Sequence, residues 1–158
     1  MNGIAYFASP VGDLRITSFQ DKITGVNFFS GERTEENLTP VLEQCMAELG
    51  EYFFSGRKFF TIDFQFTGTA FQDRVWNELL TIPYGKTMSY KDLAIRIGDV
   101  NSIRAVGLAN GQNPIAILVP CHRVIGKNGE LVGYGGGVDK KLWLLQHEGA
   151  FSEQLNLF

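Results

Sequence analysis

The pair Cys121-His122 is the part of the sequence best suited to chemistry. A thiol becomes a useful nucleophile when a base or a positive charge favours its thiolate, and a third group usually orients that base. The alternative is that Cys121 is a buried small hydrophobe, as free cysteines commonly are. Pro120 and Arg123 flank the pair and interrupt an apolar segment, where polar groups need partners. This context favours a nucleophilic cysteine.

The base for such a thiol is one of the two histidines, His122 and His147. Adjacent side chains on an extended segment point to opposite faces, so we expect His122 to reach the Cys121 sulfur through a turn or a water. His147 and Glu148 end the last predicted helix, where both also fit ordinary surface positions. The helix dipole disfavours a carboxylate at that end, which makes Glu148 a candidate partner of His122.

Metal binding is an alternative use of these residue types. The two cysteines and two histidines lack C-x2-C and H-x3-H spacing, so we expect neither a metal nor a cofactor. Cys45 lies on the apolar side of a predicted helix and should be inert. So few cysteines, with no leader sequence and no apolar run of about 18 residues, predict a cytoplasmic protein with free thiols and no membrane partner.

The residues before position 69 predict a small antiparallel sheet with one helix. The helix should begin at Pro40, behind Thr39 as N-cap, and end at Gly56. A polar break at Thr67-Gly68 marks the expected domain boundary. Four segments have the composition of short strands: residues 3–8, 13–18, 23–29 and 59–66.

Residues 69–158 predict a mainly helical second domain, which gives the whole chain an α+β class. Thr69 and Gln72 form a capping-box sequence at the start of the first helix. Two later short helices are joined around Gly98 in the pattern of a helix-turn-helix. Helices are predicted at about residues 70–82, 89–97, 102–111 and 138–147.

Charge gives a weaker indication of partners. The net charge of -3 and the pI of about 5.4 argue mildly against nucleic acid, because phosphate neutralisation by Lys and Arg drives most such binding. Residues 1–69 hold five Lys and Arg against nine Asp and Glu, whereas residues 70–150 hold nine against seven. A surface that faces DNA should therefore lie in the C-terminal half.

The run from Pro120 to Ile125 closely resembles the PCHRV active-site motif of the O6-alkylguanine-DNA alkyltransferases, the methylated-DNA-protein cysteine methyltransferases. The motif is highly specific, and the resemblance extends from about Phe71 through Gly149. It implies a remnant RNase H-like α/β domain before residue 69 and a DNA-binding, alkyl-accepting domain after it. Other segments match in the family's order and spacing: residues 82–85, 89–90, 104–107, 113–114 and 147–149.

The resemblance implies how an alkyl group would leave damaged guanine in double-stranded DNA. Cys121 would be the acceptor thiol, and His122 would withdraw its proton through a water. Glu148 would hold the imidazole, and Asn113 would hold the surrounding turn. The thiolate would displace the alkyl carbon from O6, and because a thioether has no easy way back, one turnover would consume the protein. Activity on O4-alkylthymine stays open.

The same resemblance implies contacts to the base. The Tyr90 hydroxyl would donate to ring N3 as negative charge develops on guanine. The backbone N–H of Gly135 would face O6, and the carbonyls of Cys121 and Val124 would accept from the exocyclic amine. Many relatives carry a serine at the position of Gly135, so we expect a changed tolerance of bulky alkyl groups.

The nucleotide would have to be extruded, because its O6 atom is inaccessible inside a duplex. Arg104 would fill the vacated space. Ala105 and Gly107, being small, would let the second helix of the helix-turn-helix lie closely in the minor groove. Tyr134 would flank the extruded base, and Gly136 would let the main chain come close to it.

Three other functions compete with alkyl transfer. A DNA-lesion sensor of the alkyltransferase-like type lacks the acceptor cysteine, so Cys121 with His122 and Glu148 argues against it. A transcription regulator of the fused adaptive-response type needs a second DNA-binding module, and we find none in these 158 residues. A thiol hydrolase stays open until activated esters are tested. We expect the protein to act as a monomer.

Overall fold

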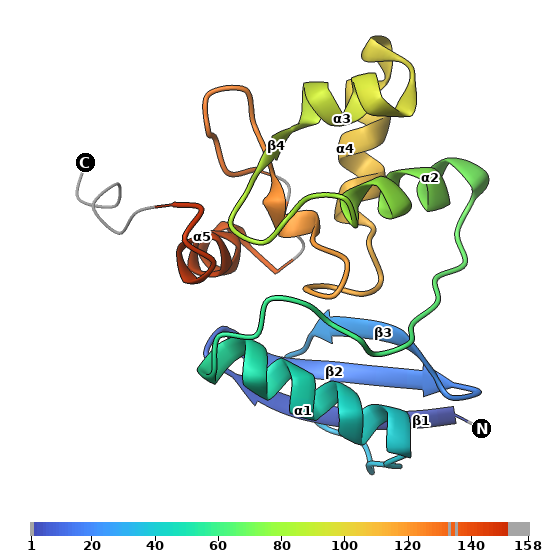
Figure 1. Cartoon of the computed structure of the whole chain (residues 1–158). Helices are drawn as coiled ribbons and strands as arrows, with labels where there is room; N and C mark the ends of the chain where they lie inside the picture. The colour runs from blue at the N-terminus through green and yellow to red at the C-terminus, as the bar shows by residue number, and fades with distance from the viewer. Residues whose placement is uncertain (1, 133, 135, 152–158) are drawn as a thin grey trace. The chain divides into compact units, whose positions relative to one another are not determined.

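The structure of the protein, a computed structural model, describes residues 2–132, 134 and 136–151. The chain divides into two compact units. The first contains the chain up to Phe66 together with Pro114–Leu118, and the second contains Thr67–Asn113 and the chain from Val119 onward. The α+β class predicted from the sequence is confirmed, because strands dominate the first unit and helices the second (Figure 1).

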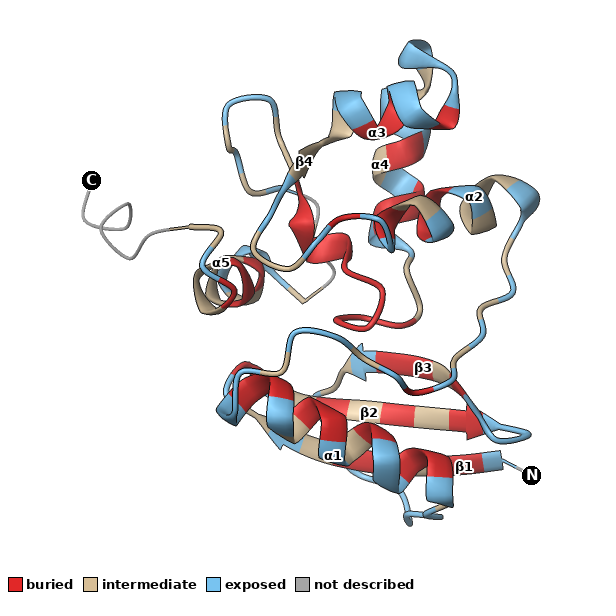
Figure 2. Ribbon diagram, in the orientation of Figure 1, coloured by how far each residue is buried: buried red, intermediate tan, exposed pale blue. Residues whose placement is uncertain are grey.

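The first unit is built on an antiparallel sheet covered by one helix. Alternate residues of its central strand, Leu14 and Ile16, are fully buried, which is the period of a sheet with one covered face. Helix α1 (Pro40–Phe54) lies along this sheet with its own buried residues on one side (Figure 2). The strands, in their spatial order, are β1 (Asn2–Ser9), β2 (Gly12–Phe19) and β3 (Lys22–Phe28).

The predicted strand at residues 59–66 is wrong. Within the described chain this segment forms no strand, and its bridge joins Phe64 to Ile23. The Ile23 N–H donates to the Asp63 carbonyl at 2.9 Å, and the Gln65 N–H donates to the Ile23 carbonyl at 2.9 Å. Because the segment forms only this bridge, the backbone N–H groups that precede it need other hydrogen-bond acceptors.

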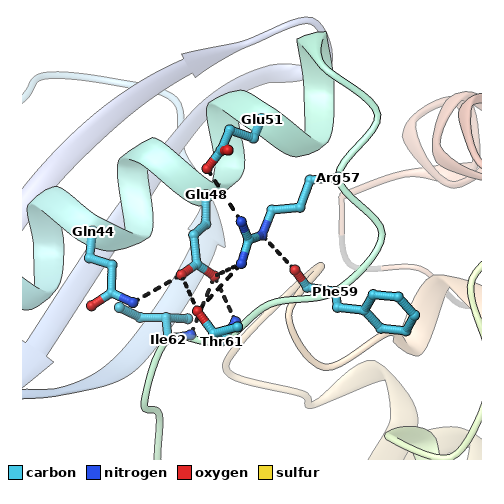
Figure 3. Close-up of polar contacts among 7 residues, drawn as sticks. All are labelled: Gln44, Glu48, Glu51, Arg57, Phe59, Thr61 and Ile62. Carbon is cyan, nitrogen blue, oxygen red and sulfur yellow. Dashed lines mark hydrogen bonds and ion pairs between the residues drawn. The ribbon is translucent and has the colours of Figure 1, made fainter.

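Glu48, a buried residue of α1, provides those partners (Figure 3). Its carboxylate accepts the Thr61 N–H at 2.8 Å, the Thr61 hydroxyl at 2.7 Å and the Ile62 N–H at 3.3 Å. Gln44 donates to it at 2.9 Å, and Arg57 pairs with it at 3.4 Å. Burial alone would raise the pKa of Glu48, but these contacts lower it below its usual value. A side chain therefore holds this segment in place of a strand ladder.

The apolar segment Pro114–Leu118 belongs to the first unit. The boundary predicted at Thr67-Gly68 places the same segment in the second domain. The Val26 N–H donates to the Pro114 carbonyl at 3.0 Å, and the Ala116 N–H donates to the Val26 carbonyl at 2.9 Å. Ile115, between these two contacts, forms a parallel bridge with Val26 and is fully buried. The segment thus pairs with the edge of the sheet at β3, which satisfies its backbone groups.

The second unit consists mainly of helices. The α-helices among its described residues are α2 (Ala70–Leu79), α3 (Tyr90–Ile97), α4 (Ile103–Gly111) and α5 (Val138–His147). Its short elements are β4 (Met88–Ser89), the parallel partner β5 (Val124–Ile125), and the 3-10 turns η1 (Val100–Ser102) and η2 (Cys121–Arg123). Among the described residues, no helix is long and apolar enough to cross a membrane.

Local signals set the ends of these helices. Thr69 and Gln72 form the predicted capping box, with N–H to side-chain oxygen distances of 2.9 and 3.1 Å. Gly98 ends α3 in the left-handed conformation, with φ 107°. Ser102 precedes α4 as predicted, but its side chain does not cap the helix; its hydroxyl donates to the Asp99 carbonyl at 2.6 Å.

Candidate active site

Cys121 begins the tight turn η2, so its backbone is not the extended segment on which neighbouring side chains point to opposite faces. The Cys121 N–H donates to the Val119 carbonyl at 2.8 Å, and the Arg123 N–H donates to the Pro120 carbonyl at 3.0 Å. All three residues of the turn are buried, and His122 is completely so. Three consecutive polar or reactive side chains therefore share the interior of the second unit.

Glu148 binds both residues that follow the cysteine. Its Oε2 lies 2.8 Å from Nε2 of His122. Its two oxygens accept from Arg123, at 2.8 Å from Nε and 3.1 Å from Nη2. A bidentate arginine contact fixes the plane of a carboxylate. Folding thus brings His122 and Glu148 into contact across 26 positions of sequence.

The charges of this cluster decide where its protons lie. Burial alone would raise the pKa of Glu148, but His122 and Arg123 hold it well below its usual value. Burial lowers the pKa of His122, although Glu148 opposes this effect, so the imidazole is neutral at pH 7. Because a carboxylate only accepts hydrogen bonds, Nε2 carries the proton and Nδ1 keeps its lone pair. Nδ1 is buried, and no described residue hydrogen-bonds to it.

The turn between α2 and β4 supports the cluster. Arg123 donates from Nη1 to the Ile82 carbonyl at 2.7 Å, and its guanidinium lies 5.8 Å from the ring centre of Tyr84. Gly85 has φ 80°, and a Cβ there would lie 3.0 Å from the Glu148 carbonyl oxygen. Both the backbone conformation and this close approach favour glycine. The contacts of Ile82, Tyr84 and Gly85 thus give the segment at residues 82–85, one of those that resemble the family, a structural role beside the Glu148 cluster.

The thiol of Cys121 is protonated at neutral pH. Burial raises its pKa, while a hydrogen bond with Asn113 and the charge of Lys141 oppose this effect. Nδ2 of Asn113 also donates to the Val119 carbonyl at 2.8 Å. Asn113 therefore contacts both the cysteine and the backbone that leads into its turn. A thiolate forms only when a base takes the proton.

Lys141 is a residue of this site that the sequence analysis missed. Its side chain is fully buried, and Nζ donates to the Tyr90 hydroxyl at 3.4 Å and to the Val132 carbonyl at 3.0 Å. Burial lowers its pKa to about 8, although Cys121 opposes this shift. The preceding Lys140 is only half-buried. No local signal distinguishes the two lysines, because the packing of α5 decides which one is enclosed.

Tyr90 begins α3, and its hydroxyl donates to the Val132 carbonyl at 2.9 Å. Burial raises its pKa, and Cys121 acts in the same direction, so the hydroxyl keeps its proton at neutral pH. The ring lies against α4, where a Cβ built on Gly107 would be 3.8 Å from Cδ1 and 3.9 Å from Cε1. These are ordinary contact distances, so the ring by itself does not require glycine at Gly107.

The other predicted base-contacting residues lie in or beyond β5. Val124 is fully buried in β5, and Gly136 lies in a turn. Burial raises the pKa of Tyr134 well above its usual value, since its hydroxyl oxygen is enclosed. Gly135 lies outside the described residues. The expected contacts of these four residues with a base stay predictions.

The exposed side of α4 carries the residues predicted to meet DNA. Arg104 and Ala105 are both exposed in the first turn of this helix. Helices α3 and α4 pack on one another and are joined by Gly98, Asp99 and η1. The pair thus has the short connection expected of a helix-turn-helix.

His147, the alternative base, takes a different position. Its ring stacks on Trp143 with the ring centres 4.9 Å apart, and its carbonyl accepts from the Tyr84 hydroxyl at 3.4 Å. The contact of Glu148 with His122 therefore favours His122 as the base. Cys45 is fully buried, and burial raises its pKa to about 12. The described residues contain no group of three or more His, Cys, Asp or Glu that could hold a metal ion.

Comparison with known proteins decides the family. Residues 70–150 match the family model of the 6-O-methylguanine DNA methyltransferase, DNA binding domain. The chain belongs to this family. A methylated-DNA–protein-cysteine methyltransferase of Methanosarcina acetivorans is 43% identical over 152 residues, which cover 92% of this chain and 97% of that protein. The family predicted from the PCHRV motif is thereby confirmed.

Solved structures of the same family share the fold. The crystal structure of Mycobacterium tuberculosis O6-methylguanine methyltransferase has a TM-score of 0.84 at 41% identity, covering 100% of this chain and 99% of that one. The structure of Mycobacterium tuberculosis OGT in complex with DNA has a TM-score of 0.82 at 43% identity and covers 92% of each chain.

Proposed function

We propose that the protein repairs DNA by moving an alkyl group from O6 of guanine to the sulfur of Cys121. The observation that carries this proposal is the buried contact of Glu148 with His122, the residue that follows the cysteine in the turn η2. The names of the relatives support the same reaction, since they describe methyl transfer from methylated DNA to a protein cysteine.

The first step would be removal of the thiol proton. Cys121 is protonated at rest because burial raises its pKa. The lone pair on Nδ1 of His122 would take this proton through a water. Glu148 would stabilise the resulting imidazolium, because its own pKa is held low and it stays ionised. Such a triad forms the thiolate only when needed.

The second step would be an in-line substitution at the alkyl carbon. The bond from sulfur to carbon forms as the bond from carbon to O6 breaks, and the electron pair of the broken bond goes to guanine. Tyr90 would exchange its 2.9 Å contact with the Val132 carbonyl for N3 of the base, to which it would give a proton. The thiol proton held by the His122 imidazolium would then return to the Tyr90 oxygen through solvent, so that the net change is one proton moved from the thiol to guanine. Lys141 lies next to this hydroxyl and would supply positive charge. Because nothing regenerates the thiol, each molecule would act once.

Binding of the base would use the backbone around the cysteine. The carbonyls of Cys121 and Val124 would accept from the exocyclic amine of guanine. Tyr134 would flank the base and Gly136 would allow close approach, while the N–H of Gly135 would face O6. The absence of a serine hydroxyl at this last position supports a changed tolerance of bulky alkyl groups.

DNA would be bound by α3 and α4 as a helix-turn-helix in the minor groove. Arg104 is exposed at the start of α4 and would occupy the space of the extruded nucleotide. Ala105 and Gly107 would allow the helix to approach the groove closely. We place the reaction in the cytoplasm and assign it to a monomer. Both cysteines are free thiols, which suits a reducing compartment.

Mass analysis of the protein mixed with an equimolar duplex that carries one O6-methylguanine tests the proposal. We expect a gain of one methyl group, confined to the peptide of Cys121, with guanine restored in the DNA. The Cys121→Ser variant should show no gain and should still bind the lesion. Tight lesion binding by the native protein without methyl gain would identify a lesion sensor instead, the second candidate.

A further inference from the structure

Asn110 is a buried polar residue to which neither the motif nor the proposed reaction gives a role. It lies near the end of α4 and is 1% exposed. Its Nδ2 donates to the Cys121 carbonyl at 3.3 Å. The same carbonyl also accepts the N–H of Val124, which closes the turn η2. Asn110 is therefore a second, side-chain donor to the backbone of the acceptor cysteine.

A second contact of Asn110 is with Tyr90. A hydrogen bond from the Asn110 side chain opposes the effect of burial, which raises the pKa of Tyr90. The geometry of α4 supports this contact independently. Gly107 lies against the Tyr90 ring, and residues three apart share one face of a helix, so Asn110 follows on the side of α4 that meets Tyr90.

The position of Asn110 is held from outside the site. The carbonyl of Ala109, the preceding residue, accepts from the Trp76 indole at 2.8 Å, which ties the end of α4 to α2. Oδ1 of Asn110 is buried and has no hydrogen-bond partner among the described residues. A buried acceptor of this kind lowers stability. An apolar side chain would avoid this cost, so the amide calls for a functional reason.

We propose that Asn110 is a positioning residue for the guanine that leaves in the transfer reaction, because it holds the Cys121 carbonyl and the Tyr90 hydroxyl in one arrangement. This inference rests on the proposed function, in which both groups contact the base. Neither contact is with the sulfur of Cys121. Asn110 also stands on the helix that carries Arg104, so it connects the DNA-facing end of α4 with the groups that receive the base.

This placement predicts that Asn110 affects two reactions of the Cys121 thiol differently. Transfer from alkylguanine needs the base to be positioned and protonated as it leaves. Alkylation of Cys121 by iodoacetamide needs the thiolate alone, since iodide leaves without help. Loss of the amide in Asn110→Leu, which keeps a similar shape, should therefore slow the first reaction and spare the second.

The experiment measures both rates at Cys121 by mass spectrometry, for the native protein, Asn110→Leu and Asn110→Ala. We expect methyl transfer to fall by about tenfold, the effect of losing one or two hydrogen bonds, while iodoacetamide alkylation stays within about twofold. Gln112→Leu, which removes an exposed amide at the end of α4, is the matched control and should change neither rate. Thermal unfolding of each variant checks that it is folded.

Coupling to Tyr90 is tested by a double-mutant cycle. Asn110→Leu should cost less in the Tyr90→Phe background than in the native protein, because the hydroxyl it positions is gone. If Asn110→Leu slowed methyl transfer and iodoacetamide alkylation equally, Asn110 would only pack the cysteine turn. If it slowed neither reaction, Asn110 would have no role in transfer. Either result overturns the inference. A native protein that takes no methyl group from guanine would instead overturn the proposed function itself.

Discussion

Lys141→Met tests whether this protein keeps a buried charge at the expense of stability. Lys141 is fully enclosed, and its pKa falls from 10.5 to about 8 in the folded chain. Below pH 8 both the folded and the unfolded chain carry the proton, so burial of the charge costs about 3 kcal/mol, at 1.36 kcal/mol for each pKa unit. Methionine is similar in length and carries no charge.

The pH dependence follows from the direction of the shift. Between pH 8 and 10.5 the folded lysine loses its proton while the unfolded one keeps it, so the unfolded state binds more protons and native stability rises with pH. The cost of burial falls from about 3 kcal/mol at pH 7 to about 1.4 kcal/mol at pH 9.5. Two lost hydrogen bonds, to Tyr90 and Val132, offset about 2 kcal/mol of the gain at either pH.

We therefore expect Lys141→Met to be more stable than the native protein by about 1 kcal/mol at pH 7, and to lose about 2 kcal/mol of this difference by pH 9.5. Urea unfolding at both pH values measures it. Lys91→Met, at an exposed lysine of α3, is the control and should show no such change. A difference that is the same at both pH values would refute a buried charge at Lys141. Methyl transfer should also slow, because the charge of Lys141 favours the Cys121 thiolate.

Three further predictions concern the cluster around the cysteine and the DNA-facing helix. Glu148→Gln should destabilise the protein by about 3 kcal/mol at pH 7, because it leaves Arg123 without its carboxylate. The pKa of Glu148 is held well below its usual value in the folded chain, so its stabilisation of the native state is present above the usual carboxyl range and is lost as the pH falls through the folded pKa. The difference should therefore change little down to pH 4 and shrink between pH 4 and pH 2 in urea unfolding, and a constant difference down to pH 2 would contradict the assignment. Arg104→Ala should weaken binding to a lesion-bearing duplex more than to undamaged DNA in fluorescence anisotropy, whereas equal weakening would make it a phosphate contact. Gly85→Ala should destabilise the protein by about 1–2 kcal/mol in thermal unfolding, because Gly85 has a positive φ and a Cβ there would lie close to the Glu148 carbonyl. Gly50→Ala is the control: Gly50 lies inside α1 with open space around it, so this change should be neutral or stabilising by up to about 1 kcal/mol.

Much of the secondary structure was predictable because its signals are local. The capping box at Thr69, the glycine after α3 and the proline at the start of α1 act within one helical turn, so the sequence alone indicates them. The strand predicted at residues 59–66 failed for a non-local reason. Its apolar composition fits a strand, but the carboxylate of Glu48 takes the N–H groups of Thr61 and Ile62.

The sequence by itself determined the family and its acceptor motif, since Cys121, His122 and Arg123 are contiguous and their order is specific. Tertiary structure alone decided that Glu148, the partner predicted for His122, also binds Arg123, that Lys141 and not Lys140 is enclosed, and that Asn110 reaches the cysteine carbonyl. The physical reason is that burial and long-range hydrogen bonds depend on which helix faces pack together. A residue's type and its neighbours in sequence do not contain that information.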